Sequence, residues 1–172
     1  MATVAPYGTW RSPITAELVT AAQVGLGQPS LDRGSVYWSE ARPQEAGRIA
    51  IVRQNSTGRI DVAPSDFNAR TRVHEYGGGA WLASDGMVFA VNFADQRMYR
   101  IDTEPVALTP ESDRKLRFAD AVLDKRRRRL VAVREDHRGG GEAVNSIVAI
   151  TLDRENPGEV LVEGHDFFSA PR

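Results

Sequence analysis

Hydrophobic positions follow two patterns along the chain, a helical one near the N-terminus and a strand-like one from Val24 onward. A serine–proline pair at 12–13 resembles a helix N-cap with proline in the first turn. Apolar residues then recur at helical spacing, which predicts a short helix over Ile14–Ala22. The preceding segment has two prolines and no periodicity, so we expect an extended arm that Tyr7 and Trp10 hold in place.

The remainder of the chain alternates apolar and polar residues in short segments that are separated by turn residues, a pattern typical of strands. An Asp-Gly pair at 85–86 predicts a tight hairpin turn between two of these segments. The predicted strand segments are Gly34–Glu40, Gly47–Arg53, Arg59–Ala63, Gly79–Ser84, Met87–Phe93, Gln96–Asp102, Pro105–Leu108, Phe118–Leu123, Arg129–Glu135, Asn145–Asp153 and Gly158–Glu163.

These strands repeat, because matching segments begin 49 residues apart at Gly47, Gln96 and Asn145. A more apolar strand precedes each of them and a short strand follows. A period of about 40 to 50 residues with four short strands is typical of β-propeller blades. We therefore predict an all-β fold: an N-terminal arm and short helix over residues 1–23, then a partial β-propeller of about three four-stranded blades over 24–172.

The number of repeats is too small for a closed ring, since propellers typically use about 4 to 8 blades. We expect the apolar second strand of each repeat between blades, and the third and fourth strands facing outward. Both ends of a three-blade arc would then expose apolar faces and favour aggregation. We therefore expect either a piece of a longer chain, or missing blades that another chain supplies.

The overall composition excludes several classes of partner. The net charge of −1 argues against a nucleic-acid or anionic-membrane surface, and the basic run Lys125–Arg129 is interpreted as a solvated hairpin tip. No apolar run approaches the ~20 residues of a membrane helix, and no secretory leader is recognisable. The chain has no cysteine, so we expect no disulfide scaffold and a cytoplasmic location.

The sequence offers no catalytic machinery of its own. No Gly-x-Ser-x-Gly motif is present, so we predict no catalytic residue within these 172 residues. No Walker phosphate loop is present either. His74, His137 and His165 lack metal-ligand spacing, and we predict neither a metal nor a cofactor.

Several motifs in a fixed order resemble one known family. The segments are Arg72–Gly79, Asn92–Arg97, Arg134–Arg138 and Gly164–Ser169, with support from Pro6–Trp10 and Ser12–Ala16. They resemble the N-terminal propeller of bacterial serine peptidases of the prolyl oligopeptidase family, of the acylaminoacyl-peptidase or dipeptidyl-aminopeptidase type. The resemblance implies partners outside this chain: the remaining blades and an α/β-hydrolase domain that carries a Ser-Asp-His triad.

The implied function is the gating and substrate-selecting part of a peptidase that hydrolyses short peptides or aminoacyl amides. Two alternatives stay open on the residues alone. One is a non-catalytic propeller or sandwich that serves as a binding scaffold, and the other is a propeller enzyme that processes sugars or metabolites. A downstream α/β-hydrolase sequence in the same gene would favour the peptidase.

The densest polar chemistry lies in Arg70–Trp81, directly before and including three glycines. Consecutive glycines predict either a positive φ or close approach of another backbone. Since the resemblance places this end of the propeller over a hydrolase active site, Arg72, Glu75 and Tyr76 are candidate substrate-binding residues. A carboxylate such as Glu75 can hold a substrate α-ammonium, and an arginine a carbonyl or carboxylate. The competing interpretation is structural: Arg72 and Glu75 pair with each other or cap backbone groups.

A second candidate group follows the apolar strand of the next repeat. Asp136 and His137 occupy a position like that of residues 92–95, so both segments are predicted in loops between second and third strands. They would line a substrate entrance. The competing interpretation is a solvated loop in which Asp136 accepts backbone amides. Anion binding by the triple-glycine runs, at 77–79 and 139–141, is a further alternative.

Overall fold

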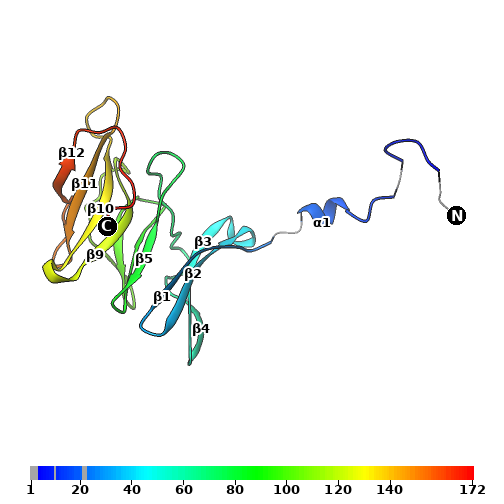
Figure 1. The fold of residues 1–172 in the computed structure, drawn as a ribbon, viewed down its shortest axis with the longest axis horizontal. Coiled ribbons are helices and arrows are strands. Elements are labelled where there is room, and N and C mark those ends of the chain that lie inside the picture. The colour runs from blue at the N-terminus through cyan, green and yellow to red at the C-terminus, as the bar shows by residue number, and fades with distance from the viewer. Residues whose placement is uncertain (1–3, 10, 21–22) are drawn as a thin grey trace.

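The computed structural model describes residues 4–9, 11–20 and 23–172, and every structural statement concerns these residues. Helix α1 spans Ala16–Thr20 and is capped by Thr15, whose Oγ1 accepts the Leu18 amide at 3.1 Å. The predicted positions 21 and 22 lie outside the described residues, as does Trp10. The Tyr7 side chain is 94% exposed, so burial of its ring does not hold the arm as predicted. Figure 1 shows α1 well apart from the sheets.

The described strands form three antiparallel four-stranded sheets, each a meander in chain order (Figure 1). Blade I contains β1 Gly25–Asp32, β2 Ser35–Arg42, β3 Arg48–Asn55 and β4 Gly58–Asp61. Blade II contains β5 Trp81–Ser84, β6 Met87–Val91, β7 Met98–Ile101 and β8 Pro105–Ala107. Blade III contains β9 Leu116–Asp124, β10 Arg129–Asp136, β11 Val144–Thr151 and β12 Glu159–Glu163. Two 3₁₀ turns, η1 Pro43–Glu45 and η2 Lys125–Arg127, join β2 to β3 and β9 to β10.

The predicted partial propeller is confirmed, and the 49-residue period corresponds to one blade. The sequence pattern did not resolve β1 as a separate strand. Its sequence, GLGQPSLD, has little apolar alternation. A register shift between Gly27 and Ser30, with Gln28 at φ 48°, interrupts its pairing with β2. Pairing with an adjacent strand, rather than its own pattern, makes this segment a strand.

Packing between blades forms the core and explains why the second strands are so apolar. Along β6, Val88 and Ala90 join the cluster between blades I and II. Phe89 and Val91, on the opposite face, join the cluster between blades II and III. A strand buried on both faces has no need of polar alternation.

The prediction that third strands face outward was wrong. In β11 Ser146, Val148 and Ile150 are fully buried, and the cluster between blades II and III extends across β9, β10 and β11. The fourth strands do face solvent, and β12 is exposed along its whole length.

Both ends of the arc expose apolar side chains, as the sequence predicted: on the outer face of blade I, Leu26, Leu31 and Val36 are 73%, 80% and 41% exposed. On blade I, residues alternating with Tyr37 face away from blade II, and Glu40 and Arg42 are among them. The Arg42 guanidinium binds Glu40 at 2.9 Å and both oxygens of Asp61 at 2.6 and 2.7 Å. An ion-pair network therefore covers the part of this face around Glu40. Blade III has the predicted apolar exposure, with Val160 and Val162 in β12 41% and 48% exposed.

Candidate functional site

The predicted site residues gather at one end of the blades. This end, called the site end below, is formed by the connection from β4 to β5 and by the β6–β7 and β10–β11 loops. The Phe93 amide donates to Asn68 O at 2.8 Å, which joins the first two segments. The His74 amide donates to Glu135 Oε1 at 2.7 Å and joins the connection to blade III. Residues 92–97 and 137–143 lie between second and third strands, which confirms the predicted loop position of His137. The loop prediction was wrong for Asp136, which is the last residue of β10 and pairs with Val144 and Leu116.

The segment Arg70–Trp81 makes the tight bend that its glycines predict. His74 and Glu75 have φ of 56° and 62°, and Gly77 has 93°. The Glu75 amide donates to Arg72 O at 2.9 Å and the Gly77 amide to Val73 O at 2.8 Å. Left-handed backbone at a non-glycine residue costs of order 1 kcal/mol or more and is frequent at functional sites. The bend thus holds His74 and Glu75 in a left-handed backbone conformation that costs conformational energy.

The other two glycines of the run are required by close approach. A Cβ at Gly79 would lie 2.8 Å from Asp120 Oδ1, and one at Gly78 would lie 3.0 Å from the Ala119 Cβ. Asp120 Oδ1 accepts the Gly79 amide at 2.6 Å, and the Asp120 amide donates to Gly79 O at 2.8 Å. These contacts fasten the bend to β9 of the next blade. Both predicted reasons for the glycines, positive φ and close approach, are therefore confirmed.

A buried carboxylate, Glu135, organises the site end. The residue is 4% exposed. Besides the His74 amide, its carboxylate has His74 Nδ1 and His137 Nε2 each at 3.1 Å. Arg117 Nη1 lies 3.7 Å from its second oxygen. Buried carboxylates require such partners, and here the partners come from the bend, from β9 and from the β10–β11 loop.

Glu75 is accessible and ionised. Its side chain is 77% exposed, and its Oε1 lies 2.6 Å from Arg117 Nη1. The hydrogen bond and the charge of Arg117 lower the pKa of Glu75 below its usual value. Arg117 Nη1 also donates to Arg72 O at 3.1 Å. The pairing partner of Glu75 is therefore Arg117 from β9, and not Arg72 as the structural alternative proposed.

A cavity of about 460 Å³ opens at this cluster and is called the acidic cavity below. Its lining includes two of the predicted site residues, Glu75 and His137. The complete lining is His74, Glu75, Glu135, His137, Glu142, Ala143, Asn145, Asp166 and Phe167. A concave space of this volume is in the range of small-ligand sites, about 300 to 1,000 Å³.

The other predicted residues lie near the cavity without lining it. The Arg72 guanidinium stacks on the Phe93 ring at 4.6 Å from its centroid. Tyr76 is 84% exposed. Asp136 binds Arg138, accepting the backbone amide at 3.0 Å and two guanidinium bonds at 2.8 and 2.6 Å. These contacts give Asp136 the turn-stabilising partners of the alternative interpretation, and a substrate role for it stays a prediction.

Sequence reasoning missed Glu135, Arg117 and Asn145 as site residues. One signal was available: Glu135 lies in register with the buried positions of an apolar strand, where a carboxylate requires partners. Arg117 gave no local signal, because it meets Glu75 only through the packing of blade III against the bend.

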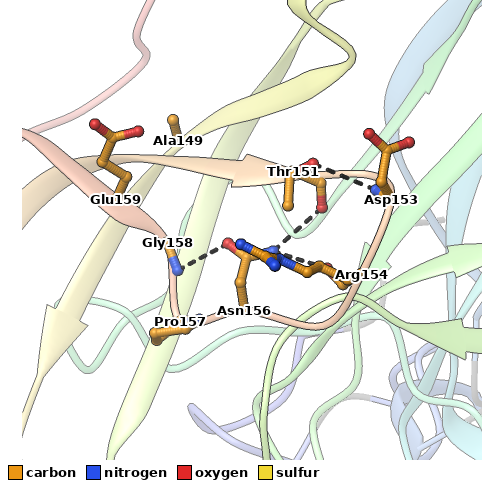
Figure 2. Close-up of a pocket in the computed structure, with 8 residues that line it drawn as sticks. All are labelled: Ala149, Thr151, Asp153, Arg154, Asn156, Pro157, Gly158 and Glu159. Carbon is orange, nitrogen blue, oxygen red and sulfur yellow. Dashed lines mark hydrogen bonds between the residues drawn. The ribbon is translucent and has the colours of Figure 1, made fainter.

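A larger cavity, of about 660 Å³, lies at the opposite end of blade III (Figure 2). Its polar lining groups bond one another, as the dashed lines in Figure 2 show. The side-chain nitrogen Nδ2 of Asn156 donates to Thr151 O and Arg154 O, and Asn156 Oδ1 accepts the Gly158 backbone amide at 3.1 Å. These bonds shape the β11–β12 turn and leave Asn156 occupied in holding it.

The basic run forms the predicted hairpin tip at η2. Lys125 pairs with Asp85 and Arg128 with Asp153, at 3.2 and 2.9 Å. Among the described residues, no cluster of three or more His, Cys, Asp or Glu side chains is arranged to hold a metal ion. Within the same residues, no helix is long and apolar enough to cross a bilayer.

Comparison with known proteins places the chain. No protein-family model matches it, and no curated protein does either. A puromycin-hydrolyzing peptidase from Mycobacterium tuberculosis is 34% identical with a TM-score of 0.85, over 99% of this chain and 29% of that one. A puromycin hydrolase is 33% identical with a TM-score of 0.73, over 88% of this chain and 25% of that one.

The chain thus spans between a quarter and a third of the length of these solved relatives. The likeness to the first of these structures extends over 99% of the chain and so includes the three blades. The chain belongs to the prolyl oligopeptidase family of peptidases, as a part of its β-propeller.

Proposed function

We propose that this chain is the gating and substrate-selecting propeller part of a serine peptidase that hydrolyses short peptides or aminoacyl amides. The remaining blades and an α/β-hydrolase domain, with the catalytic triad, would come from the rest of the parent protein. The observation that carries the proposal is the similarity to a puromycin-hydrolyzing peptidase over 99% of the chain at a TM-score of 0.85. Puromycin is itself an aminoacyl amide with a free α-amino group.

The site end supports a role in recognising the substrate amino terminus. Glu75 is mostly exposed and remains charged because Arg117 lowers its pKa. Arg117 binds Oε1, which leaves Oε2 available to a substrate ammonium. The left-handed backbone of His74 and Glu75 directs this side chain, and the hydrogen bond from Arg117 orients its carboxylate before substrate arrives. Such preorganisation reduces the entropy that binding must overcome.

The first test is hydrolysis of an aminoacyl chromogenic amide by the complete gene product and by these 172 residues alone. We expect cleavage only by the complete product. Glu75→Gln should then raise KM for a free aminoacyl amide by about tenfold, as one lost charged hydrogen bond predicts. The same variant should leave an N-acetylated substrate unaffected.

Equal kinetics of the Glu75→Gln variant on free and blocked substrates would remove the amine-recognition role. A complete gene product with no hydrolase sequence and no amidase activity would instead favour the non-catalytic binding scaffold. The cytoplasmic location stays a prediction.

A further inference from the structure

We propose that the acidic cavity binds a positively charged side chain, the ammonium of a lysine or the guanidinium of an arginine, beside the α-ammonium that Glu75 holds. This inference rests on the proposed function and names its substrate class: peptides and amides with a basic N-terminal residue. Nothing in the comparisons describes such a preference.

Charge is the first argument. The cavity lining contains four carboxylates: Glu75, Glu135, Glu142 and Asp166. Arg117 pairs with Glu75 and lies near Glu135. Glu142 and Asp166 make no ion pair or side-chain hydrogen bond with any described residue, although many surface carboxylates of this chain have arginine partners. Two unpaired carboxylates at the mouth of one cavity attract a cation.

A buried acceptor is the second and independent argument. Asn145 lines the cavity and is 8% exposed, yet its Oδ1 has no hydrogen-bond partner among the described residues. Leaving a buried acceptor unsatisfied costs about 1 to 3 kcal/mol, so such a group calls for a donor, which an ordered water, an ion or a ligand can supply. Guanidinium and ammonium groups carry several donors and no acceptor.

The walls suit the rest of such a side chain. Ala143 and Phe167 supply apolar surface along the cavity. The Phe167 ring meets the His74 ring edge-on at 5.2 Å between centroids, while remaining 68% exposed. An exposed aromatic face accepts a guanidinium plane or a methylene stem. Since Glu75 is part of the same lining, one basic residue can place its α-ammonium and its side chain together.

The experiment compares argininamide with citrullinamide by isothermal titration calorimetry on the complete gene product. The two share the α-ammonium and nearly the same shape, and only argininamide has the side-chain charge. We expect argininamide to bind about tenfold more tightly. Glu142→Gln/Asp166→Asn should reduce this ratio to nearly one. Asp153→Asn, a surface change at the opposite end of the blade, is the matched control and should leave the ratio intact.

Equal affinities for the two amides in the unmodified protein would overturn the inference, as would no binding of either. A preference for argininamide that survives the double substitution would overturn it too, since the charge would be read elsewhere. Hydrolysis of leucine p-nitroanilide by the same preparation tests the proposed function separately. A protein that cleaves the leucyl substrate without preferring argininamide keeps the proposed function and loses this inference.

Discussion

Gly79→Ala tests whether the bend is held by its close contact with β9. The added Cβ would lie 2.8 Å from Asp120 Oδ1, well inside van der Waals contact, so the carboxylate must move. Movement breaks the 2.6 Å hydrogen bond from the Gly79 amide and disturbs the 3.0 Å bond from Ala170. A bond to a carboxylate contributes about 1.5 to 3 kcal/mol. Alanine also restricts the unfolded chain, which returns about 0.4 to 1 kcal/mol.

The net expectation is a loss of about 1 to 2 kcal/mol in the free energy of unfolding. For a chain of this size, that corresponds to a fall in Tm of roughly 2 to 8 °C. Gly141→Ala is the control, because no heavy atom lies within 4 Å of its added Cβ and its φ is not left-handed. It should leave Tm unchanged or raise it slightly. Thermal denaturation followed by circular dichroism measures both variants.

A double-mutant cycle identifies the cause. Asp120→Gly removes the clashing carboxylate, and glycine tolerates the φ of 55° at that position. In that background Gly79→Ala should no longer destabilise, since its only short contact with a side chain is gone. If Gly79→Ala melts at or above the Gly141→Ala control, the argument that close approach selects glycine is refuted.

Two further predictions concern partly buried polar groups outside the bend. Arg42→Met should lower the free energy of unfolding, measured by urea titration, by about 1 to 3 kcal/mol, because Glu40, with a side chain 4% exposed, loses a partner. The control is Arg128→Met, at an exposed ion pair, which should change the free energy of unfolding by less than about 0.5 kcal/mol. Burial and the hydrogen bond to Asp95 raise the pKa of Tyr99 to about 12, so ultraviolet titration should show late ionisation of Tyr99, and Asp95→Asn should lower its pKa. Since the folded pKa exceeds the unfolded value of about 10, this contribution to stability is complete below pH 10 and is lost as the pH rises towards 12.

Much of the fold was predictable because each blade repeats one pattern. Apolar runs in the second strands predict that both of their faces are buried. The Asp-Gly pair at 85–86 predicts the hairpin that joins β5 to β6. β1 was not predictable in the same way, because its strand state depends on β2. The burial of β11 was also missed, although VNSIVAIT contains no charged residue, because the sequence does not show that the inter-blade cluster reaches a third strand.

The sequence predicted where the site lies along the chain, but it did not predict which residues contact one another there. The glycine run at 77–79 indicated a bend with ordered polar residues, and that bend is present. The partners of those residues come from other blades: Arg117 from β9 for Glu75, and Glu135 from β10 for His74. Partner choice across blades depends on how the sheets stack, which no local pattern in one segment encodes.

The ion-pair network on blade I is a second case in which the sequence indicates where residues lie but not which partners they bind. Alternation along β2 correctly indicates which residues face away from blade II, but it does not reveal whether polar residues there are paired. Arg42 joins Glu40 to Asp61, and Arg59 also contacts Glu40, so ion pairs cover the part of this face around Glu40. Leu26 and Leu31, on the same face, remain exposed. In β12 the outward residues are valine and leucine, which no such pairing can satisfy. Charge pairing therefore covers only part of the blade I face, and apolar side chains stay exposed at both ends of the arc, where a further blade or another copy can cover them.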